Sequence, residues 1–297
     1  MIVVTGATGQ AGSEVVRALA ARGERVRAFV RDPGPARHKL GANVELAVGD
    51  LADPRSVRAA LDGAGTLFLS CADDPRRVGW ETSAIDAAVA AGVRRVVKLS
   101  AVGAAPGSPV AFWDWHGRVE EHLRASGTGW VILRSSWYMS NLLAAAAQVA
   151  AEGRLYAPAG QARVAMIDPR DVGAAAAEVL LRPGLANPGH EGRTYLVTGP
   201  AAITFTEVAA GLSAAVGHRI EFTDIPGEAA EQAMIAGGMP AFVAGQIVRI
   251  FAQLRQGADR RVTATVQALT GNAPRDVAAF ARDHARLFAP AAAIGRR

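Results

Sequence analysis

Residues 1–19 read MIVVTGATGQAGSEVVRAL, a short apolar run followed by three glycines and then by a helix-like pattern. The glycines are Gly6, Gly9 and Gly12, in the spacing G-x-x-G-x-x-G. A helix that begins just after such a turn presents unpaired N–H groups and a partial positive charge, which suit a phosphate. Glycine lets a diphosphate approach the backbone, whereas a side chain would block it. The stretch therefore predicts a strand, a phosphate-binding turn and a helix.

The other residues of this turn are candidates for the same site. Thr8, Gln10 and Ala11 lie among the glycines, and the side chains of Thr8 and Gln10 can add hydrogen-bond donors. A plain strand–helix turn that happens to be rich in glycine is the alternative. The motif follows the first strand of an alternating strand–helix pattern, and this context favours dinucleotide binding.

Short apolar runs alternate with alanine-rich helical patterns along the first half of the chain. The runs that predict strands are residues 2–4, 25–30, 44–48, 66–69, 95–99 and 130–133. The windows that predict helices are residues 10–21, 54–61, 76–91 and 112–125. Apolar strands separated by helices predict a parallel sheet covered on both faces, and right-handed crossovers make it a doubly wound, Rossmann-type α/β fold.

The pattern changes after about residue 134. We expect a helix over residues 141–151, strands at 163–167, 194–197 and 220–223, and two or three apolar helices within residues 228–288. The chain is therefore divided into a dinucleotide-binding domain over residues 1–152, to which some later segments return, and a smaller domain over residues 153–297. We expect the second domain to be mostly helical and to bind substrate or act as a lid.

The residue after the second strand indicates which coenzyme would bind. NAD-binding turns carry an acidic residue here for the adenine ribose, but this chain has Arg31, whose guanidinium can pair with a 2′-phosphate. We therefore predict NADP(H). Asp32 is one position away and keeps NAD(H) possible, and a solvated loop arginine is the third interpretation.

Further candidates follow the third and fourth strands. Asp50 and Leu51 would frame the adenine, and Ser70, Cys71 and Ala72 would line the nicotinamide ribose. All of them lie at carboxyl ends of strands, where open α/β sheets bind ligands.

Composition argues against several other classes of protein. The 297 residues include 32 Lys and Arg and 27 Asp and Glu, a formal charge of +5, but no basic run suggests a nucleic-acid groove. Cys71 is the single cysteine, so neither an intramolecular disulfide nor a multi-cysteine metal site is expected, and the histidines lack companions at ligand spacing. The longest apolar stretch, residues 142–151, is too short to span a bilayer.

We therefore expect a cytoplasmic monomer or homodimer that binds neither nucleic acid nor membranes. Met1 directly precedes the first strand, which predicts no leader. The expected partner is a small aromatic or quinone-like molecule.

The motifs TGATGQAG, VRDP, VGDL, KLSAVG, EEHLRASG and LRSSWYMSNLL together resemble one family. The chain resembles the NmrA-like, atypical short-chain dehydrogenases/reductases over essentially its whole length. The resemblance implies a Rossmann domain that binds NADP(H) or NAD(H), with a small C-terminal domain over the substrate cleft. Members of the family include quinone reductases, dye and aromatic-ketone reductases, and regulators that bind the nucleotide without known turnover.

The superfamily's usual catalytic pair, a tyrosine with a lysine four residues later, is absent here. The tyrosines Tyr138, Tyr156 and Tyr195 are each followed at that distance by a leucine or a glycine. Proton transfer in this chain would therefore need other groups.

The resemblance implies where those groups lie. It places Phe112 at the tyrosine position and His116 at the lysine position, in a register that could differ by one residue, and it matches Ser100 to the superfamily's serine. An unperturbed histidine has a pKa of about 6.5, so His116 could exchange a proton at neutral pH or hydrogen-bond to the nicotinamide ribose. His116 and Ser100 are the candidate catalytic residues; a helix-surface histidine without a role is the alternative.

Aromatic residues gather after the fifth and sixth strands. Phe112, Trp113, Trp137 and Tyr138 would lie beside the nicotinamide and stack on a flat apolar substrate, although ordinary core packing is equally compatible with them. Asn141 would be a polar anchor for substrate or a cap of the next helix.

We predict from these features an NADPH-dependent reductase that transfers a hydride to a flat conjugated carbonyl compound, which is a quinone, an enone or an aromatic ketone. Such an acceptor forms a delocalised anion and needs less help from a strong acid than an alkoxide does, which fits a site without the tyrosine. The alternative is an NAD(P)-binding redox sensor without turnover.

Overall fold

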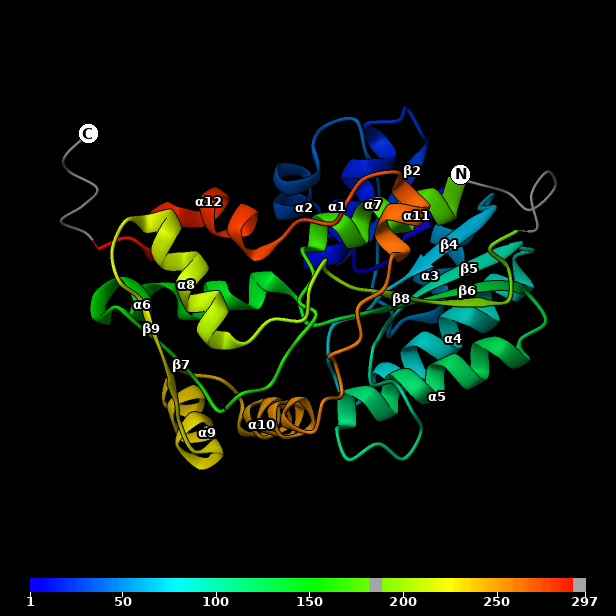
Figure 1. The fold of residues 1–297 in the computed structure, drawn as a ribbon. Coiled ribbons are helices and arrows are strands. Elements are labelled where there is room, and N and C mark those ends of the chain that lie inside the picture. Colours follow the sequence, from blue (N-terminus) through cyan, green and yellow to red (C-terminus); the bar gives the residue numbers. More distant parts are fainter. Residues whose placement is uncertain (182–188, 291–297) are drawn as a thin grey trace.

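The computed structural model describes residues 1–181 and 189–290, and within them seven strands form one sheet in the order β3-β2-β1-β4-β5-β6-β8 (Figure 1). All neighbouring strands of this sheet are parallel. The strands are β1 (Ile2–Val4), β2 (Val26–Val30), β3 (Glu45–Val48), β4 (Thr66–Leu69), β5 (Arg95–Ala101), β6 (Gly129–Ser135) and β8 (Arg193–Val197). The predicted doubly wound fold is confirmed, with its topological switch between β1 and β4.

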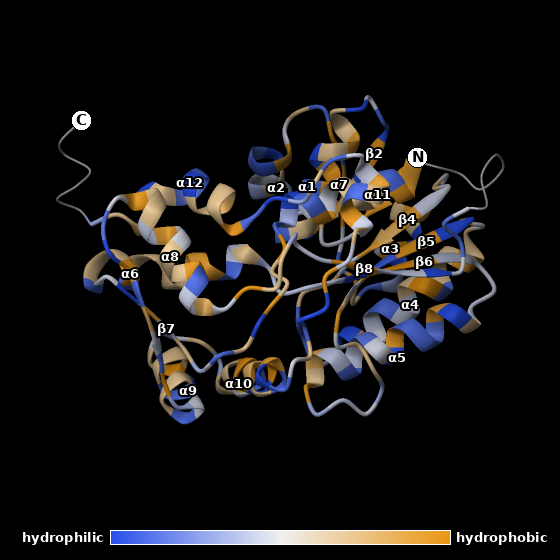
Figure 2. Ribbon diagram, viewed as in Figure 1, coloured by the Kyte–Doolittle hydropathy of each residue, from blue (hydrophilic) through white to orange (hydrophobic). Residues whose placement is uncertain are grey.

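Helices cover both faces of the sheet. One face carries α1 (Gln10–Ala20), α2 (Pro33–Leu40), α7 (Pro169–Leu181) and α11 (Thr265–Thr270). The other carries α3 (Pro54–Leu61), α4 (Arg77–Ala90) and α5 (Ala111–Ala125). Successive side chains of β1 enter opposite layers, Ile2 and Val4 on the α1 face and Val3 on the other, as a strand buried on both sides requires. Figure 2 shows β4 and β5 mainly hydrophobic, whereas α4 and α5 are mixed.

The remaining elements form a group beside the carboxyl ends of the strands (Figure 1). They are the 3-10 helix η1 (Met139–Ala145), the helices α6 (Ala146–Glu152), α8 (Phe205–Val216), α9 (Gly227–Ala236), α10 (Ala241–Arg255) and α12 (Val277–Phe288), and the strands β7 (Arg154–Ala157) and β9 (Glu221–Asp224). β7 pairs with β9 in a parallel sheet of its own. A buried apolar cluster that includes Phe205, Phe251 and Phe280 holds this group together.

Two local predictions were wrong, and two elements were missed. The region of residues 228–288 holds four helices, α9 to α12, where two or three were expected. Residues 163–167 do not form a strand; Val164 and Ile167 make isolated bridges instead, to Ile203 and Tyr138. β7 and α2 were not predicted, and α2 forms despite its two prolines because they stand in its first turn, where Asp32 caps Gly34 N–H at 2.9 Å.

The division of the chain at residue 152 stays a prediction. β8 and α7 come from beyond that residue and pack with the main sheet. Residues 182–188 and 291–297 of the expected second domain lie outside the described residues. Among the described helices, none combines the length and the apolar character needed to cross a membrane.

Candidate functional site

A cleft of about 660 Å³ lies at the carboxyl ends of the strands, between the main sheet and the second group of elements. The glycine turn, the residues after β2 to β6 and residues of α10 line it. The site residues predicted from the sequence all lie in the described ranges, and all except Phe112 line this cleft. The structure therefore brings these candidate residues, Phe112 excepted, together in one cleft at the edge of the sheet.

The glycine turn brings the N-terminus of α1 close against the sheet. Gly6 has a φ of +59°, and a Cβ there would lie 2.9 Å from the carbonyl oxygen of Ser70. A Cβ on Gly12 would lie only 2.1 Å from the carbonyl oxygen of Gly6. Gly9 is the N-cap residue and has no side chain to cap the helix, so the first-turn N–H groups are available to a ligand. This is the geometry that a diphosphate needs.

The end of β1 is also fastened to the end of β4. The Thr5 hydroxyl donates to the Ser70 carbonyl at 2.8 Å and accepts from the Ser70 N–H at 2.9 Å. Ser70, Cys71 and Ala72 therefore stand at a fixed position opposite the glycine turn. Burial raises the pKa of the Cys71 thiol to about 11, so this side chain is a neutral wall of the cleft at neutral pH.

Two cations lie near the glycine turn, Arg31 in the lining of the cleft and Lys39 beside Thr8. Arg31 is exposed and lines the cleft with Asp50 and Leu51. Lys39 of α2 donates from Nζ to the carbonyl of Thr8 at 2.7 Å. The sequence-based reasoning missed Lys39 because it did not predict α2.

A cluster of buried charged side chains supports the part of the cleft that is lined by His116 and Arg77. Lys98 of β5 and Glu81 of α4 are fully buried, with Lys98 Nζ 2.9 Å from Glu81 Oε1. Arg77 is also buried and contacts Glu81 at 3.3 Å and Asp73. These groups were missed as well, although a lysine inside the apolar strand sequence VVKLS, in a chain with two lysines, was a usable sign of a buried partner.

His116 rests on this cluster. Its Nδ1 lies 3.3 Å from Lys98 Nζ, and an ammonium can only donate, so we assign Nδ1 as the acceptor and Nε2 as the protonated nitrogen. Burial, together with the positive charges of Arg77, Lys98 and Arg134, lowers the pKa of His116 well below its ordinary value. At neutral pH the imidazole is neutral and offers a hydrogen bond rather than an acidic proton.

Ser100 is tied to a second buried carboxylate. Its hydroxyl donates to Glu120 Oε1 at 2.6 Å, and Arg134 holds the two oxygens of the same carboxylate at 2.9 and 2.6 Å. Hydrogen bonds from Arg134 and Ser100 outweigh the effect of burial and lower the pKa of Glu120. The Ser100 proton is therefore directed to Glu120.

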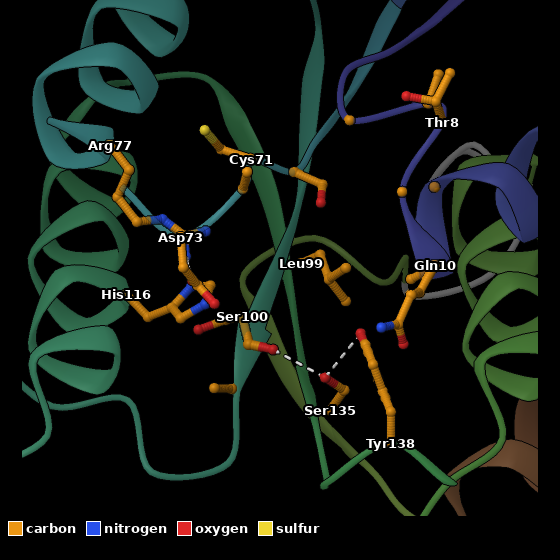
Figure 3. A pocket seen from close by; sticks show the side chains of 18 of the residues that line it. Thr8, Gln10, Cys71, Asp73, Arg77, Leu99, Ser100, His116, Ser135 and Tyr138 are labelled. Carbon is orange, nitrogen blue, oxygen red and sulfur yellow. Dashed lines mark hydrogen bonds and ion pairs between the residues drawn. The ribbon is translucent and has the colours of Figure 1, made fainter. Parts of the chain in front are cut away.

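Tyr138 closes the other side of the cleft. Figure 3 shows His116, Asp73 and Arg77 on one side, Tyr138 and Gln10 on the other, and Ser135 between Ser100 and Tyr138. Ser135 Oγ lies 3.2 Å from the Ser100 carbonyl and 3.2 Å from the Tyr138 hydroxyl. The Ser135 hydroxyl donates toward the Tyr138 hydroxyl, which accepts. Burial raises the pKa of Tyr138 to about 12, which keeps it a phenol.

The aromatic residues divide into two groups. Trp113, Trp137 and Tyr138 line the cleft, as does Asn141 of η1. Phe112 does not: its ring packs 5.5 Å from Trp115 and 6.4 Å from Phe242 of α10, between ring centroids. The structure therefore places Phe112 in the contact between α5 and α10 and not in the cleft.

A carboxyl group from a distant segment also lines the cleft. Asp259 follows α10, is 1% exposed, and accepts hydrogen bonds at Oδ2 from the Ser136 hydroxyl at 2.7 Å and the Trp137 N–H at 2.9 Å. Sequence reasoning missed it because nothing in the surrounding residues ADRR marks a site. Within residues 1–181 and 189–290, no group of three or more His, Cys, Asp or Glu side chains is arranged to hold a metal ion.

The family pattern and two curated relatives that match this chain agree with one another. The pattern of the NmrA-like family matches residues 1–281. NAD(P)H azoreductase of Xenophilus azovorans is 38% identical over 291 residues, which are 98% of this chain and 100% of the relative. The (4-alkanoyl-5-oxo-2,5-dihydrofuran-3-yl)methyl phosphate reductase of Streptomyces griseus has the same identity and coverage.

The solved structures agree with the sequence relatives. The NADPH-dependent quinone oxidoreductase of Escherichia coli, in its complex with NADPH, superposes with a TM-score of 0.85 at 29% identity, over 95% of this chain and 99% of that one. The sequence matches span 98% of this chain, and the structural match covers 95% of it. This chain belongs to the NmrA-like family.

Proposed function

We propose that this chain is an NAD(P)H-dependent oxidoreductase that prefers NADPH. The observation that carries the proposal is the glycine turn, in which a Cβ on Gly12 would collide with the Gly6 carbonyl at 2.1 Å and in which no side chain caps α1. A turn this tight is needed where a diphosphate must reach the backbone, and it opens into a cleft large enough for a dinucleotide and a small substrate. The names of the relatives support the same activity.

The coenzyme would lie along the cleft from the exposed cations to the aromatic residues. Its diphosphate would accept from the first-turn N–H groups at Gly9 to Gly12, with Thr8 and Gln10 beside it. Arg31 would pair with the 2′-phosphate, and Lys39, which donates to the Thr8 carbonyl, would add a second positive charge near the glycine turn. Asp50 and Leu51 would frame the adenine.

The nicotinamide end would rest on the residues that follow β4 and β5. Ser70, Cys71 and Ala72 would line the ribose, and His116 would donate to it through Nε2, as the superfamily's lysine would. When bound, the reduced coenzyme supplies a hydride. The chain's own residues orient the reactants and exclude water from them.

The substrate would occupy the aromatic part of the cleft, between Trp113, Trp137 and Tyr138, with Asn141 as polar anchor. We propose a flat, conjugated carbonyl compound: a quinone, an enone or an aromatic ketone. The name of the Streptomyces relative describes a ring double bond conjugated with carbonyl groups, which is the enone case. Ser100 would fix the floor of this site through Glu120.

An azo compound is the second candidate substrate, because NAD(P)H azoreductase is 38% identical over the whole cleft-forming chain. An azo compound is flat, conjugated and able to accept a hydride, so the same aromatic walls suit it. The two substrate classes differ in how much they need a proton: a quinone forms a stabilised oxyanion, whereas a reduced azo nitrogen is strongly basic.

Turnover tests the proposal. Purified protein is mixed with NADPH and, separately, with 1,4-benzoquinone, an enone, an aromatic ketone and methyl red, and the loss of reduced-nicotinamide absorbance is followed. We expect substrate-dependent oxidation of NADPH with at least one carbonyl compound. Tight coenzyme binding without oxidation across the panel would favour the redox-sensor alternative, and absence of both would reject the proposal.

A further inference from the structure

We infer that Asp259 is the catalytic acid of this cleft, which delivers a proton to the reduced substrate. The inference rests on the proposed reductase function and assigns a chemical role that neither His116 nor Ser100 can fill in the observed arrangement. It depends on the position of Asp259, on the unequal environments of its two carboxyl oxygens and on the protonation of the groups around it.

Asp259 is held at the substrate end of the cleft. It lies in residues 256–264, between α10 and α11, and lines the cleft together with Trp137, Tyr138, Ile250 and Leu254. Its carbonyl accepts from the N–H of Ala165 at 2.8 Å, which fixes the backbone. The side chain therefore projects from a fastened segment toward residues that follow β6, on the nicotinamide side of the switch point.

The two carboxyl oxygens have different surroundings. Oδ2 accepts from Ser136 and from the N–H of Trp137, which fixes the orientation of the group. Oδ1 is buried and has no hydrogen-bond partner among the described residues. A buried polar atom without a partner is costly, and a substrate oxygen or nitrogen beside Trp137 would be the partner that Oδ1 lacks.

The carboxyl also retains its proton more strongly than an ordinary aspartate. Burial raises the pKa of Asp259 to about 6, and the hydrogen bonds from Trp137 and Ser136 to Oδ2 act in the opposite direction. The neighbouring Arg255, Arg260 and Arg261 are exposed, and Arg255 pairs with Asp224. Tyr138, which faces the same part of the cleft, is a neutral phenol, so no charged contact in this part of the described structure offsets the burial of Asp259.

The other groups near the expected substrate are poorer proton donors at neutral pH. His116 is neutral, Ser100 donates to Glu120, and burial raises the pKa of Tyr138 to about 12. Burial raises the pKa of the Cys71 thiol, and burial also raises the pKa of Asp73, whose carboxylate is held by Arg77. Asp259 differs from Asp73 because it combines a raised pKa with no paired cation among the described residues and with a carboxyl oxygen that has no partner, which suits a general acid.

The step balances with the proposed reaction. A substrate that has accepted a hydride, and with it two electrons, carries a negative charge on an oxygen or a nitrogen. The O–H bond of Asp259 breaks, its electron pair stays on the carboxylate, and a new O–H or N–H bond forms on the substrate. Water then returns a proton to Asp259, so one hydride and one proton are consumed in each turnover.

The test compares Asp259→Asn with the wild-type chain. Asparagine can still accept from Ser136 and Trp137 but carries no transferable proton. We expect kcat to fall about 10²–10⁴-fold with methyl red, and less with 1,4-benzoquinone, while the Kd for NADPH stays unchanged.

The pH profile is the second readout. Wild-type kcat should fall as the pH rises through about 6, and kcat of the Asp259→Asn variant should lack this dependence. Asp276→Asn, which replaces an exposed helix N-cap by an equally good one, should match the wild type.

A second variant distinguishes proton donation by Asp259 from a purely structural role of its hydrogen bonds. Ser136→Ala keeps the carboxyl group but removes one hydrogen bond that favours its charged form, so the pH at which kcat declines should move upward. An Asp259→Asn variant within threefold of wild-type kcat and with the same pH profile would overturn the inference, because Asp259 would then only fasten the segment. An unmoved profile in Ser136→Ala would contradict it too.

A spectroscopic titration gives a readout without turnover. The infrared band of protonated carboxyl groups is followed against pH in the coenzyme-free wild type and in Asp259→Asn. The component present in the wild type and missing from the variant should be lost near pH 6. Titration of this band at the pH of an ordinary aspartate would overturn the inference even in an active enzyme.

Failure of the proposed function is a different outcome. A wild-type protein that binds NADPH but reduces no member of the panel would overturn the proposed function, and with it the role of Asp259, even if the band titrates as expected.

Discussion

The two ends of the cleft are built in different ways. The coenzyme end is made largely by one contiguous stretch, in which Gly6, Gly9 and Gly12 bring α1 against the sheet. The substrate end is assembled from side chains far apart in the sequence: Lys98, His116 and Asp259 come from β5, α5 and the segment after α10. Local backbone geometry shapes the coenzyme end, whereas the substrate end depends on the burial of side chains that the fold brings together from distant parts of the sequence. Changes to the first should therefore alter binding, and changes to the second should alter stability and proton transfer.

The largest expected effect concerns the buried charges beneath His116. Lys98→Met leaves Glu81 buried without its closest cation, and breaking such a pair costs about 3–5 kcal/mol of unfolding free energy. Urea unfolding at neutral pH measures this loss. Arg154→Met is the control, because the contact of Arg154 with Glu221 is long and exposed and contributes at most about 1 kcal/mol. Equal losses in the two variants would show that the cluster is not a structural support of this end.

At the coenzyme end, Gly12→Ala should weaken NADPH binding. The added Cβ would lie 2.1 Å from the Gly6 carbonyl and would push α1 away from the sheet. Overpacking costs about 1–3 kcal/mol, so the Kd from NADPH fluorescence should rise roughly tenfold to a hundredfold. Gly79→Ala, in α4 where a Cβ meets nothing within 4 Å, should leave the Kd unchanged. Unaltered affinity in Gly12→Ala would place the diphosphate elsewhere.

Arg31→Ala should distinguish the two coenzymes. Loss of one exposed, charge-assisted contact to a 2′-phosphate should cost about 1–2 kcal/mol, so NADPH should bind roughly tenfold more weakly and NADH should be unaffected. Separate calorimetric titrations with each coenzyme measure this, with Arg286→Ala, at an exposed position of α12, as control. A parallel loss for both coenzymes would mean that Arg31 does not read the phosphate.

The smallest expected effect is the pH dependence of stability at the substrate end. Asp259 has a pKa of about 6 in the folded chain, above its ordinary value of 3.8, so the folded state binds the extra proton. Its contribution to stability therefore grows as the pH falls through 6 and is lost as the pH rises. Between pH 7 and pH 5, the wild type should gain about 1 kcal/mol over Asp259→Asn. Urea unfolding at both pH values checks this, and a constant difference would contradict the raised pKa.

The difference between the coenzyme end and the substrate end also explains which features could be predicted from the sequence. The glycine spacing, the apolar strands and the residues at strand ends are local patterns, and they located the fold and the cleft. Phe112 was misplaced because neighbouring helical residues point about 100° apart: Trp113 and His116, three positions apart, face the cleft, whereas Phe112 and Trp115 face α10.

Chemistry at the substrate end could not be predicted in the same way. The pKa of His116 depends on Lys98 and Arg77, which reach it from other elements, and no spacing in the sequence encodes that contact. Asp259 is separated from Trp137 by 122 positions. Burial, which raises the pKa of one group and lowers that of the other, is a property of the folded chain.

Calorimetric titration of the nucleotide-free wild-type chain with NADPH tests the central claim most directly. A coenzyme held by the first-turn N–H groups of α1 should give saturable heat with one site per chain, and NADH should bind more weakly. Absence of heat with either coenzyme, in protein shown to be folded, would contradict the assignment of the glycine turn and of the cleft it opens into.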